Sequence, residues 1–231
     1  MQIGTDLVVL SSITTVFISA VIGTYLGRKW YSQHVRLITD LPLVFAIAFV
    51  SQAFNIMILT LQHMGLLETT MIFFRIRSIT IGGSITPILG ALLQIWAPRI
   101  QKYHNRLVYS LTLYWVSMAL FGPTEELIMI LTIPVMILLG IMMMLTFIIT
   151  WRTGRLKEVR SELMIVSVLF GMASQILRVP LMSTPMFYVP DVLLTISMVV
   201  TAVAFANPWY HREIRARREE APPMVSGYES Y

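Results

Sequence analysis

Seven long apolar runs, separated by short polar segments, dominate this sequence of 231 residues. A helix that crosses a bilayer needs roughly 20 mainly apolar residues, and most of the runs are about that long. They are continuous rather than alternating with a period of two, which favours helices over a transmembrane β-barrel. With only 13% charged residues, the chain cannot give a soluble fold of this size a charged surface. The runs cover residues 7–27, 41–61, 76–96, 107–121, 127–151, 163–181 and 189–206.

These runs predict an all-α, polytopic membrane protein with seven transmembrane helices. The segment 75–96 is the most distinctive, because it begins with two arginines and contains a Gly-Gly pair and a proline. The fourth run is the shortest, and we expect its helix to extend toward Tyr103. The seven helices would form one domain over residues 1–210, and residues 211–231 would form a short charged tail.

Positive charge alternates between the segments that join the runs. Lysine and arginine gather after the first, third, fifth and seventh runs, whereas acidic residues occupy the other connections. Because cytoplasmic loops carry an excess of lysine and arginine, this pattern predicts a multi-pass plasma-membrane protein with its N-terminus outside and its C-terminus in the cytoplasm. The basic residues are Arg28, Lys29, Arg36, Arg99, Lys102, Arg106, Arg152, Arg155, Lys157, Arg160, Arg212, Arg215, Arg217 and Arg218, and the acidic residues are Glu68, Glu125, Glu126 and Asp191.

Several kinds of chemistry lack the residues that they need. There is no cysteine, which excludes disulfides, thiolate metal sites and cysteine nucleophiles. Retinal would need a lysine in the last helix, and membrane haem would need histidines that face each other within the bilayer; neither pattern occurs. We interpret the methionine run 142–144 as packing rather than as a copper site. The sequence predicts no metal, no cofactor and no nucleic-acid partner, and it does not favour an enzyme.

Strongly polar residues inside the apolar runs gather in the half that this orientation places outside. They recur at helical spacing on the second and sixth runs, so each set shares one face of its helix. An arginine in mid-membrane costs about 2.5–3.5 kcal/mol on insertion scales, so each such side chain needs a partner or water. One hypothesis is therefore a ligand-binding pocket, open to the outside, for a small polar or anionic molecule. Its lining residues would be Gln52, Asn55, Arg77, Gln175 and Arg178.

A purely structural role explains the same residues, and the sequence leaves both interpretations open. In the structural interpretation, Arg77 and Arg178 form ion pairs that fix the order of the helices. Arg75 is two residues from Arg77, so it points roughly 200° away on a helix and would reach outward. The ion-pair partners would be Glu125, Glu126 and Asp191, and the predicted hinge positions are Gly82, Gly83, Pro87 and Pro134.

Four features together resemble the seven-helix membrane sensor region of archaeal and bacterial histidine kinases. They are the outside N-terminus, the Arg-Lys-Trp-Tyr exit of the first run at 28–31, a proline in the third helix, and the basic segment 152–160 before the sixth. The similarity covers most of residues 5–207 and concerns topology rather than a diagnostic motif. It implies a sensor, and because no dimerisation helix or kinase domain follows, the signal would pass to a separate partner.

The turn Gly-Pro-Thr-Glu-Glu-Leu at 122–127 is similar to the Pro-x-Glu-Glu helix start of membrane lycopene cyclases. That family implies acids that serve a carbocation reaction, and it repeats the motif. No second copy occurs here. We interpret the turn as a helix start with acids in its first turn, where the helix dipole favours negative charge.

The leading functional prediction is a sensor- or receptor-like module in the lipid bilayer that signals to a cytoplasmic or membrane partner. The partner would contact the cytoplasmic loops and tail, or the first and fifth helices. Three alternatives stay open: an accessory subunit of a larger membrane complex, a small-molecule carrier, and an enzyme that acts on lipids or isoprenoids.

Overall fold

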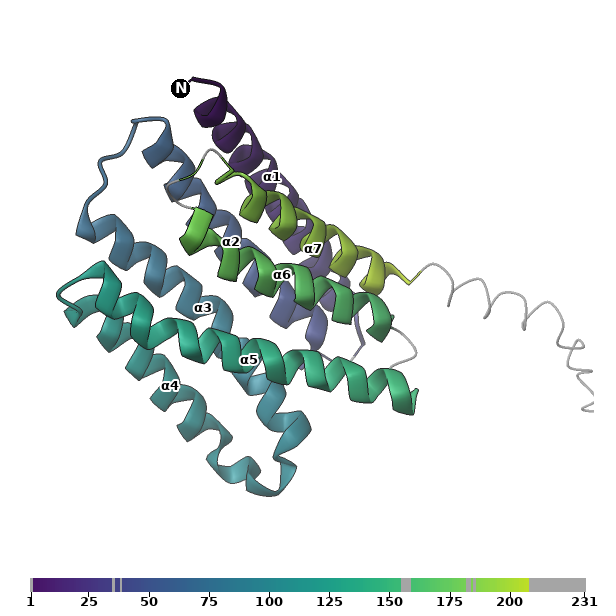
Figure 1. Cartoon of the computed structure of the whole chain (residues 1–231). Coiled ribbons are helices and arrows are strands. Elements are labelled where there is room, and N and C mark those ends of the chain that lie inside the picture. Colours follow the sequence, from purple (N-terminus) through teal and green to yellow (C-terminus); the bar gives the residue numbers. More distant parts are fainter. Residues whose placement is uncertain are drawn as a thin grey trace, which may run out of the picture.

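The computed structural model describes residues 2–34, 36–37, 39–154, 159–181, 184 and 186–207. Within these residues the chain is mainly α-helical and contains no β-strand, as Figure 1 shows. The basic residues at 155, 157 and 212–218, and the predicted tail at 211–231, lie outside the described residues. The helices are α1 (Gln2–Tyr31), α2 (Leu41–His63), α3 (Met71–Trp96), the short 3₁₀ helix η1 (Pro98–Ile100), α4 (Gln101–Phe121), α5 (Glu125–Thr153), α6 (Ser161–Leu181) and α7 (Val189–Ala206).

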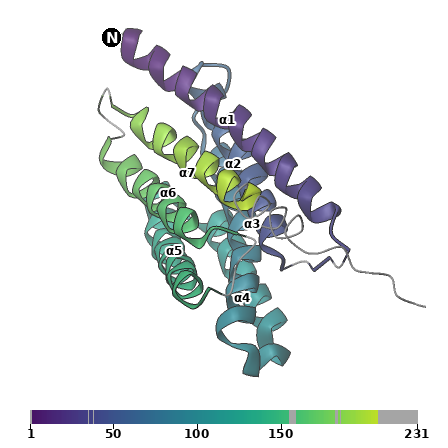
Figure 2. The same cartoon turned by 90° about the vertical axis from the view of Figure 1, so that its right-hand side faces the viewer.

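Helices that follow one another in the sequence pack side by side, and α1 also packs against α7, so the bundle closes into a ring. Because α3 additionally contacts α5, α4 lies on the outside of the ring. Figure 2 shows α1, α7, α6 and α5 following one another along one side of the bundle. The helices α1, α3, α5 and α7 begin at the same end (Figure 1), which we call the N-terminal face; the other end is the opposite face.

Six of the described helices are long and apolar enough to cross a membrane, namely α1 to α3 and α5 to α7. To that extent the prediction of an all-helical, multi-pass membrane protein is confirmed. The exception is α4, in which Lys102, His104 and Arg106 lower the hydropathy of the first two turns. The helix begins at Gln101, ahead of the predicted run, and its 21 residues extend about 31 Å, enough for a bilayer core.

Glycines bring two pairs of helices close together. A Cβ on Gly23 of α1 would lie 2.8 Å from Val50 on α2, and a Cβ on Gly82 of α3 would lie 2.4 Å from Cδ1 of Trp115 on α4. The space at Gly82 lets the buried Trp115 donate its Nε1–H to the carbonyl of Ser78 at 2.7 Å. Lipid is as apolar as a helix surface, so close packing and hydrogen bonds of this kind hold α4 against α3.

The predicted hinge positions lie in helices that run without a break. α3 is continuous through Gly82, Gly83 and Pro87, and α5 is continuous through Pro134. Gly82 is buried against α4, whereas Gly83 and Pro134 are exposed. Proline has no N–H to donate to the preceding turn, so each helix lacks one backbone bond at its proline. The role of these positions as hinges stays a prediction.

Candidate functional site

A buried carboxylate, Asp191 in the first turn of α7, joins three helices near the N-terminal face. Its side chain is only 2% exposed. Arg178 of α6 donates from Nη2 to Oδ1 at 2.5 Å, and Ser12 of α1 donates from Oγ to Oδ2 at 2.6 Å. Both carboxylate oxygens therefore have partners, as a buried charge requires. We call Ser12, Arg178 and Asp191 the acid cluster.

The local sequence supports each member of the acid cluster. Asp191 lies in the first turn of its helix and Arg178 in the last turn of its own, so each charge is favourable to its helix dipole. Hydroxyl groups strengthen the same contacts between helices. Thr15 of α1 lies 2.8 Å from Thr195 of α7, oxygen to oxygen, and Ser174 of α6 donates to a carbonyl at the start of α7 at 2.7 Å. The polar face of α1 is therefore used inside this chain.

Arg77 and Asn55 form a second polar contact, between α3 and α2. The Nε of Arg77 donates to Oδ1 of Asn55 at 3.0 Å, and Asn55 is buried. Arg178 and Glu125 are close enough to Arg77 to act on it electrostatically. The structure thus brings the two predicted pocket arginines into one charged region, and each of them is bonded to a side chain of the bundle.

His63, the last residue of α2, belongs to this charged region and was not singled out from the sequence. The charges of Arg77, Arg178 and Asp191 all act on it. Its Nδ1 is buried and has no hydrogen-bond partner among the described residues. Helical spacing in the sequence could have indicated His63, because it follows Asn55 by eight residues and so shares a face of α2 with it.

The two predicted acidic partners on α5 lie at the exposed start of that helix. Glu125 and Glu126 are exposed in the first turn of the helix, and neither forms an ion pair with Arg77 or Arg178. Thr124 caps this turn, since its side chain accepts the backbone N–H of residue 127 at 3.3 Å. The geometry is that of a capped helix start, as interpreted from the sequence.

Two further polar side chains have different surroundings. The sequence predicts that Arg75 reaches outward, but in the structure its Nη2 donates to the carbonyl of Gly122 at 3.1 Å. Because Gly122 ends α4, this bond fastens α3 to the turn before α5. Gln52 lies half-buried on α2 and does not contact the acid cluster through a hydrogen bond.

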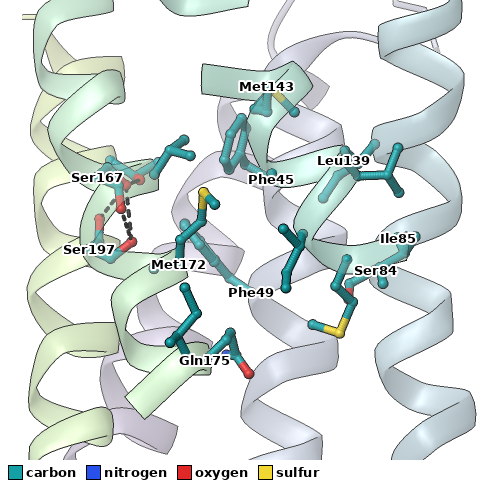
Figure 3. A pocket seen from close by; sticks show the side chains of 18 residues that line it. Phe45, Phe49, Ser84, Ile85, Leu139, Met143, Ser167, Met172, Gln175 and Ser197 are labelled. Atoms are coloured by element: carbon teal, nitrogen blue, oxygen red, sulfur yellow. Dashed lines mark hydrogen bonds between the residues drawn. The ribbon is translucent and has the colours of Figure 1, made fainter. Parts of the chain in front are cut away.

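A cavity of about 230 Å³ lies at the centre of the ring, among α2, α3, α5, α6 and α7 (Figure 3). Its wall is mainly apolar, and no charged side chain among the described residues lines it. Of the residues predicted for a pocket, Gln175 lines the cavity, whereas Gln52, Asn55, Arg77 and Arg178 do not. The charged region near the N-terminal face and the cavity deeper in the bundle are therefore neighbouring but separate features.

Comparisons of the chain with protein-family models, with curated proteins and with solved structures found no match. Over the described parts of the chain, no group of three or more histidine and acidic side chains is placed to hold a metal ion.

Hydroxyl groups form the cavity wall where α6 meets α7. The Oγ of Ser167 lies 3.1 Å from that of Ser197 and 2.5 Å from Oγ1 of Thr201, and Ser197 donates to the carbonyl of Ser167 at 2.8 Å. Figure 3 shows the contact between Ser167 and Ser197 at one side of the cavity. We call these three residues the hydroxyl chain. Because they are bonded to one another, they hold α6 to α7 rather than offer free donors to a ligand.

Proposed function

We propose that this chain is a sensor- or receptor-like module of the plasma membrane, which binds a small molecule inside its helix bundle and signals to a cytoplasmic or membrane partner. The observation that carries the proposal is the central cavity, a space of about 230 Å³ bordered by five helices. Unfilled space in a packed interior forfeits contacts, so a molecule that fills it stabilises the arrangement of helices that it fits. A ligand that favours one arrangement over another shifts their populations, which is the basis of a signal.

The acid cluster is well placed to pass such a shift between helices. Gln175 at the cavity and Arg178 in the acid cluster are three residues apart on α6, so they are neighbours on one helix face. A displacement of α6 at the cavity therefore moves Arg178, and the ion pair carries Asp191 with it. Because Asp191 also binds Ser12, the displacement reaches α1 as well as α7.

The proposal includes seven membrane-crossing helices and an outside N-terminus. The length of α4 suffices to cross, and its charged residues lie in its first two turns, at the opposite face, where lipid headgroups accept them. The described basic residues that support a cytoplasmic opposite face are Arg28, Lys29, Arg36, Arg99, Lys102, Arg106, Arg152 and Arg160.

Spin-label distances test the signalling step. The sequence contains no cysteine, so a pair of introduced cysteines can be labelled without first removing native ones. Tyr31→Cys and Thr153→Cys place labels on exposed ends of α1 and α5 at the opposite face. Native mass spectrometry of protein extracted in mild detergent identifies the molecule that stays bound, which is then removed and added back.

We expect the distance distribution between the two labels to change when the bound molecule is restored. Asp191→Asn, which removes the negative charge from the acid cluster, should reduce that change while the molecule still binds. An unchanged distribution in the otherwise unaltered protein, with the molecule shown to be bound, would refute the sensor proposal.

A second candidate, an accessory subunit of a larger membrane complex, is favoured by the surface of α4. Tyr109 is 73% exposed and Ser110 is exposed next to it, near the middle of the helix. A polar group that faces lipid at that depth is unfavourable unless another protein covers it. Co-purification with a stoichiometric membrane partner, lost on Ser110→Leu together with Tyr109→Leu, would support this candidate over the sensor.

A further inference from the structure

The volume of the cavity limits the size of the molecule that it can hold. An apolar cavity of about 150 Å³ holds benzene, which corresponds to roughly 25 Å³ for each carbon atom. On that scale a cavity of about 230 Å³ takes about nine heavy atoms. Its lining on α6 runs from Ser167 to Ile176, about 14 Å along the helix axis, so the space extends parallel to the helices.

The wall of the cavity selects for an uncharged and mainly apolar occupant. Aromatic and thioether side chains such as Phe45, Phe49 and Met172 cover it, and a carboxylate or ammonium group inside would lose its hydration without gaining a counter-ion. The hydroxyl chain is already satisfied internally. Gln175 is different, because its side chain forms no hydrogen bond with the described residues and lies at one end of the cavity, as Figure 3 shows.

The exposed residues that line the cavity lie on α5 and α6, which indicates a lateral opening between these two helices. Two of its lining residues, Ile137 of α5 and Ile176 of α6, are 37% and 55% exposed on the outer surface of the bundle. One turn toward the opposite face the two helices are in contact, since a Cβ on Gly140 would lie 3.2 Å from Sδ of Met172. Ile137 lies about 18 Å along α5 from its start, which is near the middle of a bilayer core of about 30 Å. The opening therefore faces acyl chains rather than water.

We propose that this cavity binds an uncharged, mainly apolar molecule or chain of about nine heavy atoms, which enters from the bilayer between Ile137 and Ile176 and presents one hydrogen-bonding group to Gln175. The inference rests on the proposed function for the biological use of the site, and it names the chemical class of the ligand. Two sources supply this chemistry: a free small molecule dissolved in the membrane, and the chain of a bilayer lipid.

Photolabelling locates the occupant directly. The probe is 1-octanol that carries a diazirine, because octanol has the required size, no charge and one hydroxyl group. Protein in lipid nanodiscs is irradiated and the labelled residues are mapped by mass spectrometry. We expect saturable labelling of lining residues such as Met136 and Met172, displaced by unlabelled 1-octanol. Octanoate, which has the same chain and a charge, should compete at least tenfold less well.

Tryptophan substitutions test the lateral opening with a matched control. Ile176→Trp should reduce labelling of the cavity at least fivefold, because a larger ring closes the edge between α5 and α6. Leu169→Trp lies two turns away on the same exposed face of α6, does not line the cavity, and should leave labelling within twofold. If Ile176→Trp does not fold, Ile137→Trp takes its place, with the exposed Ile130→Trp of α5 as its control. Gln175→Leu should weaken competition by octanol about two- to tenfold, the contribution of one neutral hydrogen bond.

Each result bears on the proposal. Label confined to lipid-facing residues such as Leu169, undisplaced by excess octanol, would overturn it. Cavity labelling that neither Ile176→Trp nor Ile137→Trp reduces would also overturn it. A phosphatidylcholine with a diazirine in its acyl chain separates the sources, because labelling of Met172 by this lipid, blocked by Ile176→Trp, identifies the occupant as a lipid chain. Cavity labelling without any spin-label response would refute the sensor function but not the binding site. A spin-label response without cavity labelling would refute the binding site but not the sensor function.

Discussion

The strongest test of the structure is to break the buried ion pair at the N-terminal face. Asp191→Ala leaves the guanidinium of Arg178, which is 17% exposed, without its carboxylate, and it leaves the hydroxyl of Ser12 without an acceptor. Arg178→Leu instead leaves the carboxylate of Asp191, which is 2% exposed, without its arginine and with Ser12 as its remaining side-chain partner among the described residues. Exchanging both residues for leucine removes both charges together and leaves apolar side chains in their place.

The size of each effect follows from which charge is left behind. Removal of one partner from a buried ion pair costs about 3–5 kcal/mol. Because Arg178 keeps some exposure near the end of its helix, we expect the lower figure, about 3 kcal/mol, for Asp191→Ala. The paired exchange to leucine leaves no uncompensated charge, and such exchanges are often close to neutral. The sum of the two single costs should therefore exceed the cost of the double variant by at least about 2 kcal/mol.

The assay is the free energy of unfolding of each variant in detergent micelles, followed by far-ultraviolet circular dichroism during titration with a denaturing detergent. Asp6→Ala is the control, because it removes an exposed acid from the part of α1 that also carries Ser12. It should change the free energy of unfolding by less than about 0.5 kcal/mol. A cost below about 1 kcal/mol for Asp191→Ala, or single costs that add within about 0.5 kcal/mol, would show that the pair does not hold these three helices together.

Two further predictions use the same preparation, and a third uses intact cells. Gly82→Ala places a methyl group 2.4 Å from the buried indole of α4 and should cost about 1–3 kcal/mol in unfolding free energy, whereas Gly83→Ala next to it should cost under about 1 kcal/mol; equal costs would contradict the close contact. Thr124→Ala removes the cap of α5 and should cost about 1 kcal/mol, with Thr124→Ser near neutral. In intact cells a membrane-impermeant maleimide should label Glu68→Cys and should label Arg99→Cys only after permeabilisation; the reverse pattern would invert the proposed orientation.

The positions of the helices could be read from the sequence because a bilayer demands long apolar segments and tolerates little else. For α4, the apolar segment predicts only part of the helix. Its first two turns carry charged residues such as Lys102 and Arg106, so an apolar run marks only its later part. The helix nevertheless continues back to Gln101, because backbone hydrogen bonding, not apolarity, determines where a helix begins.

Depth in the bundle was predictable, whereas the choice of partner was not. Counting residues from the helix ends places Arg77, Arg178 and Asp191 at a similar level, since each helix rises about 1.5 Å per residue. Which side chains then meet depends on how each helix is rotated, and packing against all its neighbours determines that. Arg77 consequently bonds to Asn55 rather than to an acid on α5. Apart from Gln175, the sequence did not indicate the cavity, because most of the residues that line it are apolar and apolar residues also face lipid.

The two sides of α6 are held in different ways, and this difference connects the acid cluster with the cavity. Toward α7, hydrogen bonds run the length of the helix, from the hydroxyl chain to the pair of Arg178 and Asp191. Toward α5, the hydrogen bonds lie at the opposite face. There Oγ1 of Thr150 lies 3.1 Å from Oγ of Ser161, and Nε1 of Trp151 donates to Oε1 of Glu162 at 2.8 Å. Hydrogen bonds between membrane helices contribute about 0.6 kcal/mol each and are directional, whereas apolar contacts can slide. Filling the cavity should therefore displace α5 relative to α6, while α6 and α7 move together. Because Ser12 joins α1 to Asp191, α1 moves with them, and the distance between the ends of α1 and α5 changes.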